Sequence, residues 1–106
     1  MKHVSAKEFA PFTHKLSEGK AEFMGDGIFV VLQLDPIARK RQNVVLSKDD
    51  LAALRALPGL TVSLEEGVAE YAGSGVWGVF QDDNTTGKPQ NVFLTEQDLE
   101  ALLAAA

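Results

Sequence analysis

Two polar dipeptides are the clearest candidates for recognition chemistry in this chain. Gln42-Asn43 and Gln90-Asn91 each precede a short apolar run, and they lie 48 residues apart. A side-chain amide carries both donors and an acceptor, so a pair of amides can bond to a ligand in a defined orientation. The alternative is that each asparagine bonds to nearby backbone where a loop enters a strand. We therefore treat all four residues as possible binding residues and keep the structural alternative open.

Carboxylates recur at the same spacing. Glu22 and Glu70 could form a pair for acid–base catalysis or a carboxylate metal site. No histidine accompanies them, and the chain has no cysteine, so solvent-facing strand positions are the simpler interpretation. We expect no catalytic residue, no metal and no cofactor. The enzyme alternative is a pocket between two halves of the molecule, lined by this pair together with Gln33 and Gln81.

A basic cluster, Arg39-Lys40-Arg41, is the one feature that favours nucleic acid. The rest of the chain opposes it, because the net charge is −5 and residues 59–106 contain one basic and eight acidic side chains. A solvated loop or an acidic protein partner is the preferred interpretation. The acidic half of a second copy is one such partner, which predicts weak, salt-sensitive self-association.

The aromatic residues of the chain suggest either a core or an exposed patch for a partner. Phe29, Trp77, Phe80 and Phe93 make up most of this aromatic mass. Trp77 is the possible binding residue among them, although its neighbour Gly78 suggests that bulk has been removed to fit a larger ring inside a core.

An internal duplication must position all of these side chains. Residues 13–54 align with 61–102 without a gap, and 20 of the 42 aligned pairs are identical. The period lies in the range of structural repeats, but two copies are too few for a solenoid. We therefore predict two similar units packed as a pseudo-twofold pair within a single domain, 1–106.

Three similar segments carry helix-capping signals. Each has a serine or threonine followed three residues later by an acid, which predicts helices starting near residues 5, 47 and 95. Leu51, Leu54 and Leu57 then recur at helical spacing.

Between the helices the pattern changes to that of strands. Leu60, Val62 and Leu64 alternate with polar residues, and Gly-x-Gly loops at 25–27 and 73–75 separate apolar segments as in hairpins. Segments 16–24 and 64–72 also fit a helical face, but an internal glycine in each favours strands. We predict an α+β fold of tandem β-β-β-α units, with one pseudo-twofold antiparallel sheet and three helices.

Composition is that of a soluble globular protein, with 45% hydrophobic and 24% charged residues. No apolar run is long enough to span a membrane, and the first residues show no secretory signal, so we expect a cytoplasmic protein. We expect a small non-enzymatic adaptor or regulator that binds another protein. A nucleic-acid-binding regulator using Arg39-Lys40-Arg41 and an enzyme with a site between the repeats are the alternatives.

Overall fold

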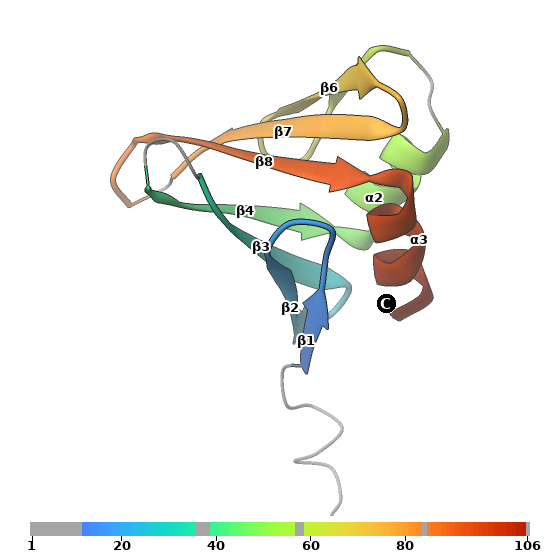
Figure 1. Cartoon of the computed structure of the whole chain (residues 1–106), viewed down its shortest axis with the longest axis horizontal. Helices are drawn as coiled ribbons and strands as arrows, with labels where there is room; N and C mark the ends of the chain where they lie inside the picture. The colour runs from blue at the N-terminus through green and yellow to red at the C-terminus, as the bar shows by residue number, and fades with distance from the viewer. Residues whose placement is uncertain (1–11, 36–38, 57–58, 84, 106) are drawn as a thin grey trace, which may run out of the picture.

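The chain folds as two copies of one unit, each a four-stranded antiparallel sheet followed by a helix (Figure 1). The computed structural model describes residues 12–35, 39–56, 59–83 and 85–105. The first unit comprises β1 (Phe12–Lys15), β2 (Lys20–Gly25), β3 (Ile28–Leu34), β4 (Arg41–Ser47) and α2 (Lys48–Ala56). The second comprises β5 (Thr61–Ser63), β6 (Val68–Gly73), β7 (Val76–Asp82), β8 (Pro89–Thr95) and α3 (Glu96–Ala105). Strand order follows the chain in both sheets.

The predicted fold class is wrong in three respects, although α+β holds. Each unit has four strands rather than three, and the strands form two sheets rather than one. Two helices, not three, occur in the part of the chain that the structure describes. The segment near residue 5, where the additional helix was expected, lies outside the described residues. The ambiguous segments 16–24 and 64–72 contribute strands β2 and β6, as favoured above.

Residues 48 positions apart occupy equivalent places. Every strand pair of the second sheet reproduces a pair of the first, so that Ala69 opposite Val79 matches Ala21 opposite Val31. The central hairpins turn on two residues, Asp26-Gly27 in one unit and Ser74-Gly75 in the other. All four turn residues have positive φ, between 54° and 76°, which is the geometry of the tight hairpin turn that matches strand twist.

Both helices begin at the predicted caps. Ser47 Oγ accepts the N–H of Asp50, and the N–H of Ser47 donates back to Asp50 Oδ2, both at 3.0 Å. Thr95 and Asp98 form the same reciprocal pair before α3. The shorter aspartate therefore closes a capping box of the kind in which glutamate is more usual.

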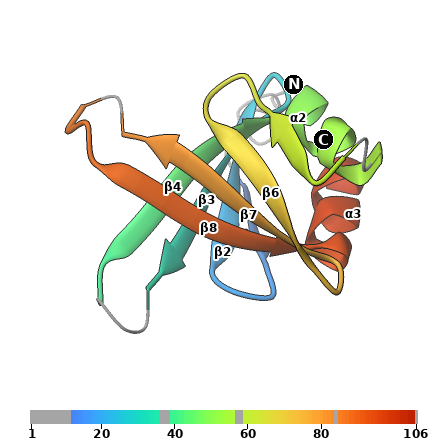
Figure 2. The same cartoon turned by 90° about the horizontal axis from the view of Figure 1, so that it is seen from above.

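One shared core joins the two units. The core lies between the inner faces of both sheets and one side of each helix. Its largest fully buried side chains include Phe29, Trp77, Leu46, Leu94, Leu54 and Leu102. The helices pack against each other at one end of the molecule, where Arg55 Nε lies 2.6 Å from Glu100 Oε1. The β3–β4 and β7–β8 hairpins cross, and their far ends diverge on the side away from the helices (Figure 2).

Candidate binding groove at the seam between the repeats

Glutamine side chains, rather than backbone ladders, join the two sheets at their seam. Strands β4 and β8 lie next to each other there. Gln81 Oε1 accepts the N–H of Val45 at 2.9 Å, and Gln81 Nε2 donates to the carbonyl of Val45 at 2.6 Å. Gln33 makes the equivalent pair of bonds to Phe93, at 2.9 and 2.6 Å. Each amide thus occupies the backbone groups that a neighbouring strand would otherwise use, which explains why two sheets form instead of one continuous sheet.

The two predicted dipeptides also lie at this seam. Gln42 Oε1 accepts the N–H of Asn91 at 3.0 Å, and Gln90 Oε1 accepts the N–H of Asn43 at 2.9 Å. The glutamine of each dipeptide therefore bonds to the opposite repeat, and the asparagine supplies a backbone donor. Neither interpretation of the sequence anticipated bonds between the repeats, although recurrence of a polar residue in both copies is the signal that could have indicated them.

The caps fasten the repeats together as well. Asp98 Oδ1, at the start of α3, accepts the N–H of Ser17 in the first repeat at 2.9 Å. Asp50 Oδ1, at the start of α2, accepts the N–H of Glu65 in the second repeat at 3.0 Å. Both aspartates are only 5% exposed, so these bonds are shielded from water.

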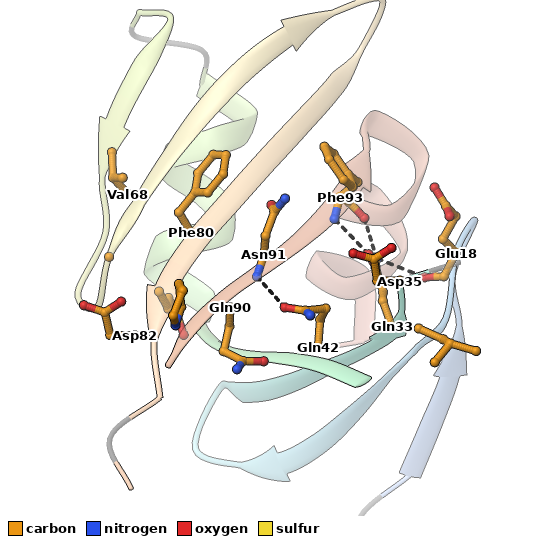
Figure 3. A pocket seen from close by; sticks show the side chains of 14 residues that line it. Glu18, Gln33, Asp35, Gln42, Val68, Phe80, Asp82, Gln90, Asn91 and Phe93 are labelled. Atoms are coloured by element: carbon orange, nitrogen blue, oxygen red, sulfur yellow. Dashed lines mark hydrogen bonds between the residues drawn. The ribbon is translucent and has the colours of Figure 1, made fainter. Parts of the chain in front are cut away.

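A groove of about 810 Å³ opens at the seam, toward the far ends of the crossing hairpins (Figure 3). Its wall on the side of the first repeat comes from the β1–β2 turn, the end of β3 and the start of β4, and the rest comes from the second repeat. The lining residues are Glu18, Gln33, Leu34, Asp35, Gln42, Gly67, Val68, Phe80, Gln81, Asp82, Pro89, Gln90, Asn91 and Phe93. We refer to this feature as the seam groove.

Two aromatic rings give the seam groove its apolar character. Phe80 is 38% exposed and Phe93 is 43% exposed, on neighbouring strands of the second sheet. Gly78 lies directly opposite Phe93 and two residues before Phe80, and a Cβ built on it would meet atoms of both rings at 3.3–3.6 Å. The rings therefore cover the place where Gly78 has no side chain, an arrangement known to support glycine within sheets.

The structure changes the interpretation of Gly78. The sequence linked this glycine to Trp77, but adjacent residues in a strand point to opposite faces. Trp77 faces the core and is 1% exposed, whereas Gly78 lies under the phenylalanine rings on the outer face. In the core, the ring centroid of Trp77 lies 5.1 Å from that of Tyr71. Trp77 belongs to the core and also lines a smaller pocket beside the helices, while Phe80 and Phe93 are exposed in the seam groove.

Asn91 contributes a polar group between the two rings. It stands opposite Phe80 in the strand register, and its side chain projects between those of Phe80 and Phe93 (Figure 3). Its Oδ1 is buried and has no hydrogen-bond partner among the described residues. An unpaired buried acceptor costs about 1–3 kcal/mol relative to a bonded one. A donor brought by a ligand would therefore be bound favourably once the amide turns toward it.

The charged groups of the seam groove all have one sign. Glu18, Asp35 and Asp82 are the charged residues among its described lining, and all are acidic. The predicted basic cluster lies nearby but does not line the groove: Arg39, Lys40 and Arg41 are exposed where the chain enters β4. Arg39 adopts a φ of 56°, and its N–H donates to the carbonyl of Asp35 at 2.8 Å.

The loop at the end of the second hairpin is held by a carboxylate. Asp83 accepts the N–H groups of Thr85 at 2.7 Å and Thr86 at 3.0 Å. These bonds, with that of Thr86 the larger influence, lower the pKa of Asp83 below its ordinary value because they stabilise the charged form.

The predicted carboxylate pair is not brought together in the groove. Glu22 lies on β2 and Glu70 on β6, in different sheets, and neither lines the seam groove, whereas Gln33 and Gln81 do. Within the described residues, no group of three or more histidine, cysteine, aspartate or glutamate side chains is placed to hold a metal ion. The seam groove thus combines two exposed rings, a buried acceptor without a partner among the described residues, and three acidic side chains.

No helix in the described part of the chain has the length and apolar character that crossing a membrane requires. Comparisons with protein-family models, with curated proteins and with solved structures find no match to this chain.

Proposed function

We propose that this protein is a non-enzymatic binding module that holds an extended segment of a partner protein in the seam groove. The observation that carries the proposal is the pair of exposed rings, Phe80 and Phe93, in a groove whose lining also includes the apolar Leu34, Val68 and Pro89. Large aromatic side chains in a concave site are typical anchors of protein interfaces, because they bury much area at little cost in side-chain entropy.

The surroundings of the rings favour a polypeptide over a compact small molecule. The groove is open and runs along strands β7 and β8. Among its polar groups, Asn91 has an Oδ1 without a hydrogen-bond partner among the described residues, and its amide can bond to the donors and acceptors of an extended backbone. A protein that binds a partner segment in this way and catalyses no reaction would act as an adaptor or regulator.

A pair of matched variants tests the proposal. In the groove variant, Phe80→Leu and Phe93→Val give the second repeat the residues that the first has at Leu32 and Val45. In the control variant, Leu32→Ala and Val45→Ala alter those equivalent positions instead. Each form, checked for folding by its NMR spectrum, is used to capture partners from extracts of the native cell with and without nuclease.

We expect the wild-type protein and the control variant to retain the same partner proteins after nuclease treatment, and the groove variant to lose them. Partners that the groove variant retains equally would overturn the assignment of the groove. Capture that disappears with nuclease would point to nucleic acid instead.

Single-stranded nucleic acid is the second candidate, favoured by one specific observation. Exposed rings on the face of a sheet can stack on bases, and the exposed Arg39, Lys40 and Arg41 lie on the neighbouring hairpin. The acidic lining of the seam groove opposes it. Fluorescence titration with oligo(dT) and oligo(rU) at 50 and 200 mM salt tests this candidate, which requires affinity that falls steeply with salt and with alanine at these three positions.

A further inference from the structure

The acidic lining of the seam groove indicates the charge of its occupant. Glu18, Asp35 and Asp82 line it, and the described lining includes no basic residue. A lysine or arginine in the groove would find opposite charge beside an apolar surface, most directly at Asp82, which lies on the same strand face as Phe80. Complementary charge of this kind selects between partners more than it adds affinity.

The strand geometry places this charge at a fixed distance from an apolar anchor point. Phe80 and Asp82 are two residues apart on β7, so their side chains project from the same face. Two residues of strand span roughly 7 Å. An extended peptide lying along β7 presents its own residues i and i+2 on one side with the same spacing. An apolar side chain on the rings would therefore place the side chain two positions away beside Asp82.

Asn91 provides the contact that would fix this peptide against the strand. It lies opposite Phe80 and carries the unpaired Oδ1 between the rings. Because the amide can turn about its terminal torsion, it can offer its acceptor to a backbone N–H of the peptide and its donors to a backbone carbonyl.

We propose that the seam groove recognises extended peptide segments in which an apolar residue is separated by one residue from a lysine or arginine. The apolar side chain packs on Phe80 and Phe93, the cation pairs with Asp82, and Asn91 bonds to the peptide backbone. This inference rests on the proposed function, because it specifies which protein segments the groove accepts.

Labelled synthetic peptides test the inference directly. The probes are fluorescein-labelled, acetylated and amidated nine-residue peptides of serine and glycine that contain Leu-Ser-Lys, Leu-Ser-Gln, Leu-Ser-Glu or Leu-Lys-Ser. Binding to the full chain is measured by fluorescence anisotropy, and the site by chemical-shift changes in the ¹⁵N-labelled protein. We expect the Leu-Ser-Lys peptide to bind about 10-fold more tightly than the Leu-Ser-Glu peptide and about 3-fold more tightly than the Leu-Lys-Ser peptide.

Matched variants test whether Asp82 causes the preference for the lysine-containing peptide. Asp82→Asn removes the charge that is proposed to read the cation, and Asp26→Asn makes the same change at an exposed turn outside the groove. We expect Asp82→Asn to weaken the Leu-Ser-Lys peptide about 3- to 10-fold while leaving the Leu-Ser-Gln peptide unchanged. Asp26→Asn should change neither, and Asn91→Ala should weaken both peptides alike.

The outcomes separate the inference from the function on which it rests. Equal binding of the lysine and glutamate peptides, or a lysine preference that survives Asp82→Asn, would overturn the inference and leave the groove as a peptide site. If no peptide shifts the resonances of Phe80, Asn91 and Phe93, the proposed function fails as well.

Discussion

The outer faces of the two sheets occupy equivalent positions but differ in chemistry. In the second repeat the face carries Val68, Phe80, Pro89, Asn91 and Phe93, and in the first repeat the same positions hold Lys20, Leu32, Arg41, Asn43 and Val45. One face is aromatic beside acidic groups. The other is aliphatic with the cations of Lys20 and Arg41, and Lys20 lies 3.7 Å from the carboxylate of Glu22 on the same face.

The inner positions show the opposite behaviour. The glutamines and aspartates that cross the seam, and much of the core, are the same residue types in both repeats. Substitution of a buried or doubly bonded residue leaves a cavity or an unpaired group, which costs several times more than an exposed change. The comparison indicates that the two repeats share the residues that hold the seam and the core, and differ on their outer faces.

The largest loss of stability should come from replacing two glycines that occupy equivalent positions in the two repeats. Gly19 and Gly67 have positive φ, and a Cβ on either would overlap a backbone carbonyl, that of Leu32 or Phe80. We expect Gly19→Ala and Gly67→Ala each to lower the free energy of unfolding by about 3 kcal/mol, from the backbone conformation and the steric overlap together.

Urea denaturation followed by tryptophan fluorescence measures these losses. Gly25→Ala is the control, because its φ is also positive but a Cβ there meets nothing within 4 Å. A control as damaging as Gly67→Ala would show that backbone conformation alone accounts for the effect. Unequal losses at Gly19 and Gly67 would break the equivalence of the two repeats.

We expect smaller losses of stability when the seam glutamines are replaced, and a larger loss at Gln81 than at Gln33. Gln81 is 8% exposed, so Gln81→Ala leaves the N–H and C=O of Val45 without protein partners at a cost of about 2 kcal/mol. The bonds of Gln33 to Phe93 are exposed, and water can replace them, so Gln33→Ala should cost about 0.5 kcal/mol. The same denaturation assay compares the two, and equal losses would mean that burial does not distinguish these bonds.

The outer faces can be made more alike by one substitution. Gly78→Val installs the residue that the first repeat has at Val30, in a strand position with ordinary φ. Valine suits a strand better than glycine, so we expect a gain of about 0.5–1 kcal/mol if the ends of the two rings give way. The rings must shift to do so, and peptide binding in the seam groove should fall. Unchanged binding would show that the positions of the two rings do not determine peptide binding.

The smallest expected effect is the pH dependence of stability that arises from Asp83. The pKa of Asp83 is lowered in the folded protein, so its contribution to stability is complete above the unfolded value and is lost as pH falls through the folded value. NMR titration of the carboxyl carbon should therefore give a midpoint below 3.8, the ordinary value. Thr85→Gly with Thr86→Gly should leave the midpoint low, because the donors are backbone N–H groups; a return to the ordinary value would contradict this account.

Some of the seam groove could be predicted from the sequence, and some could not. Gln42, Gln90 and Asn91 were identified because polar residues recur in both copies, and all three line the groove. Phe80 and Phe93 were left open between a core and an exposed patch, with only Trp77 named as a possible binding residue. Each replaces an aliphatic residue of the other repeat, and Phe80 lies three residues from Trp77 in the same strand. Strand alternation places positions of this spacing on opposite faces, so this signal was present in the sequence.

Local patterns in the sequence determined the duplication, the strand character of 16–24 and 64–72, and the caps of α2 and α3, because each depends on residues close together in the chain. Only the tertiary structure decided that there are two sheets and not one, since this depends on glutamine side chains that reach backbone groups 36 to 60 residues away. The same holds for the seam groove and its acidic lining, which exist because crossing hairpins bring distant residues together. Side-chain contacts between remote segments have no periodicity, so no local pattern can encode them.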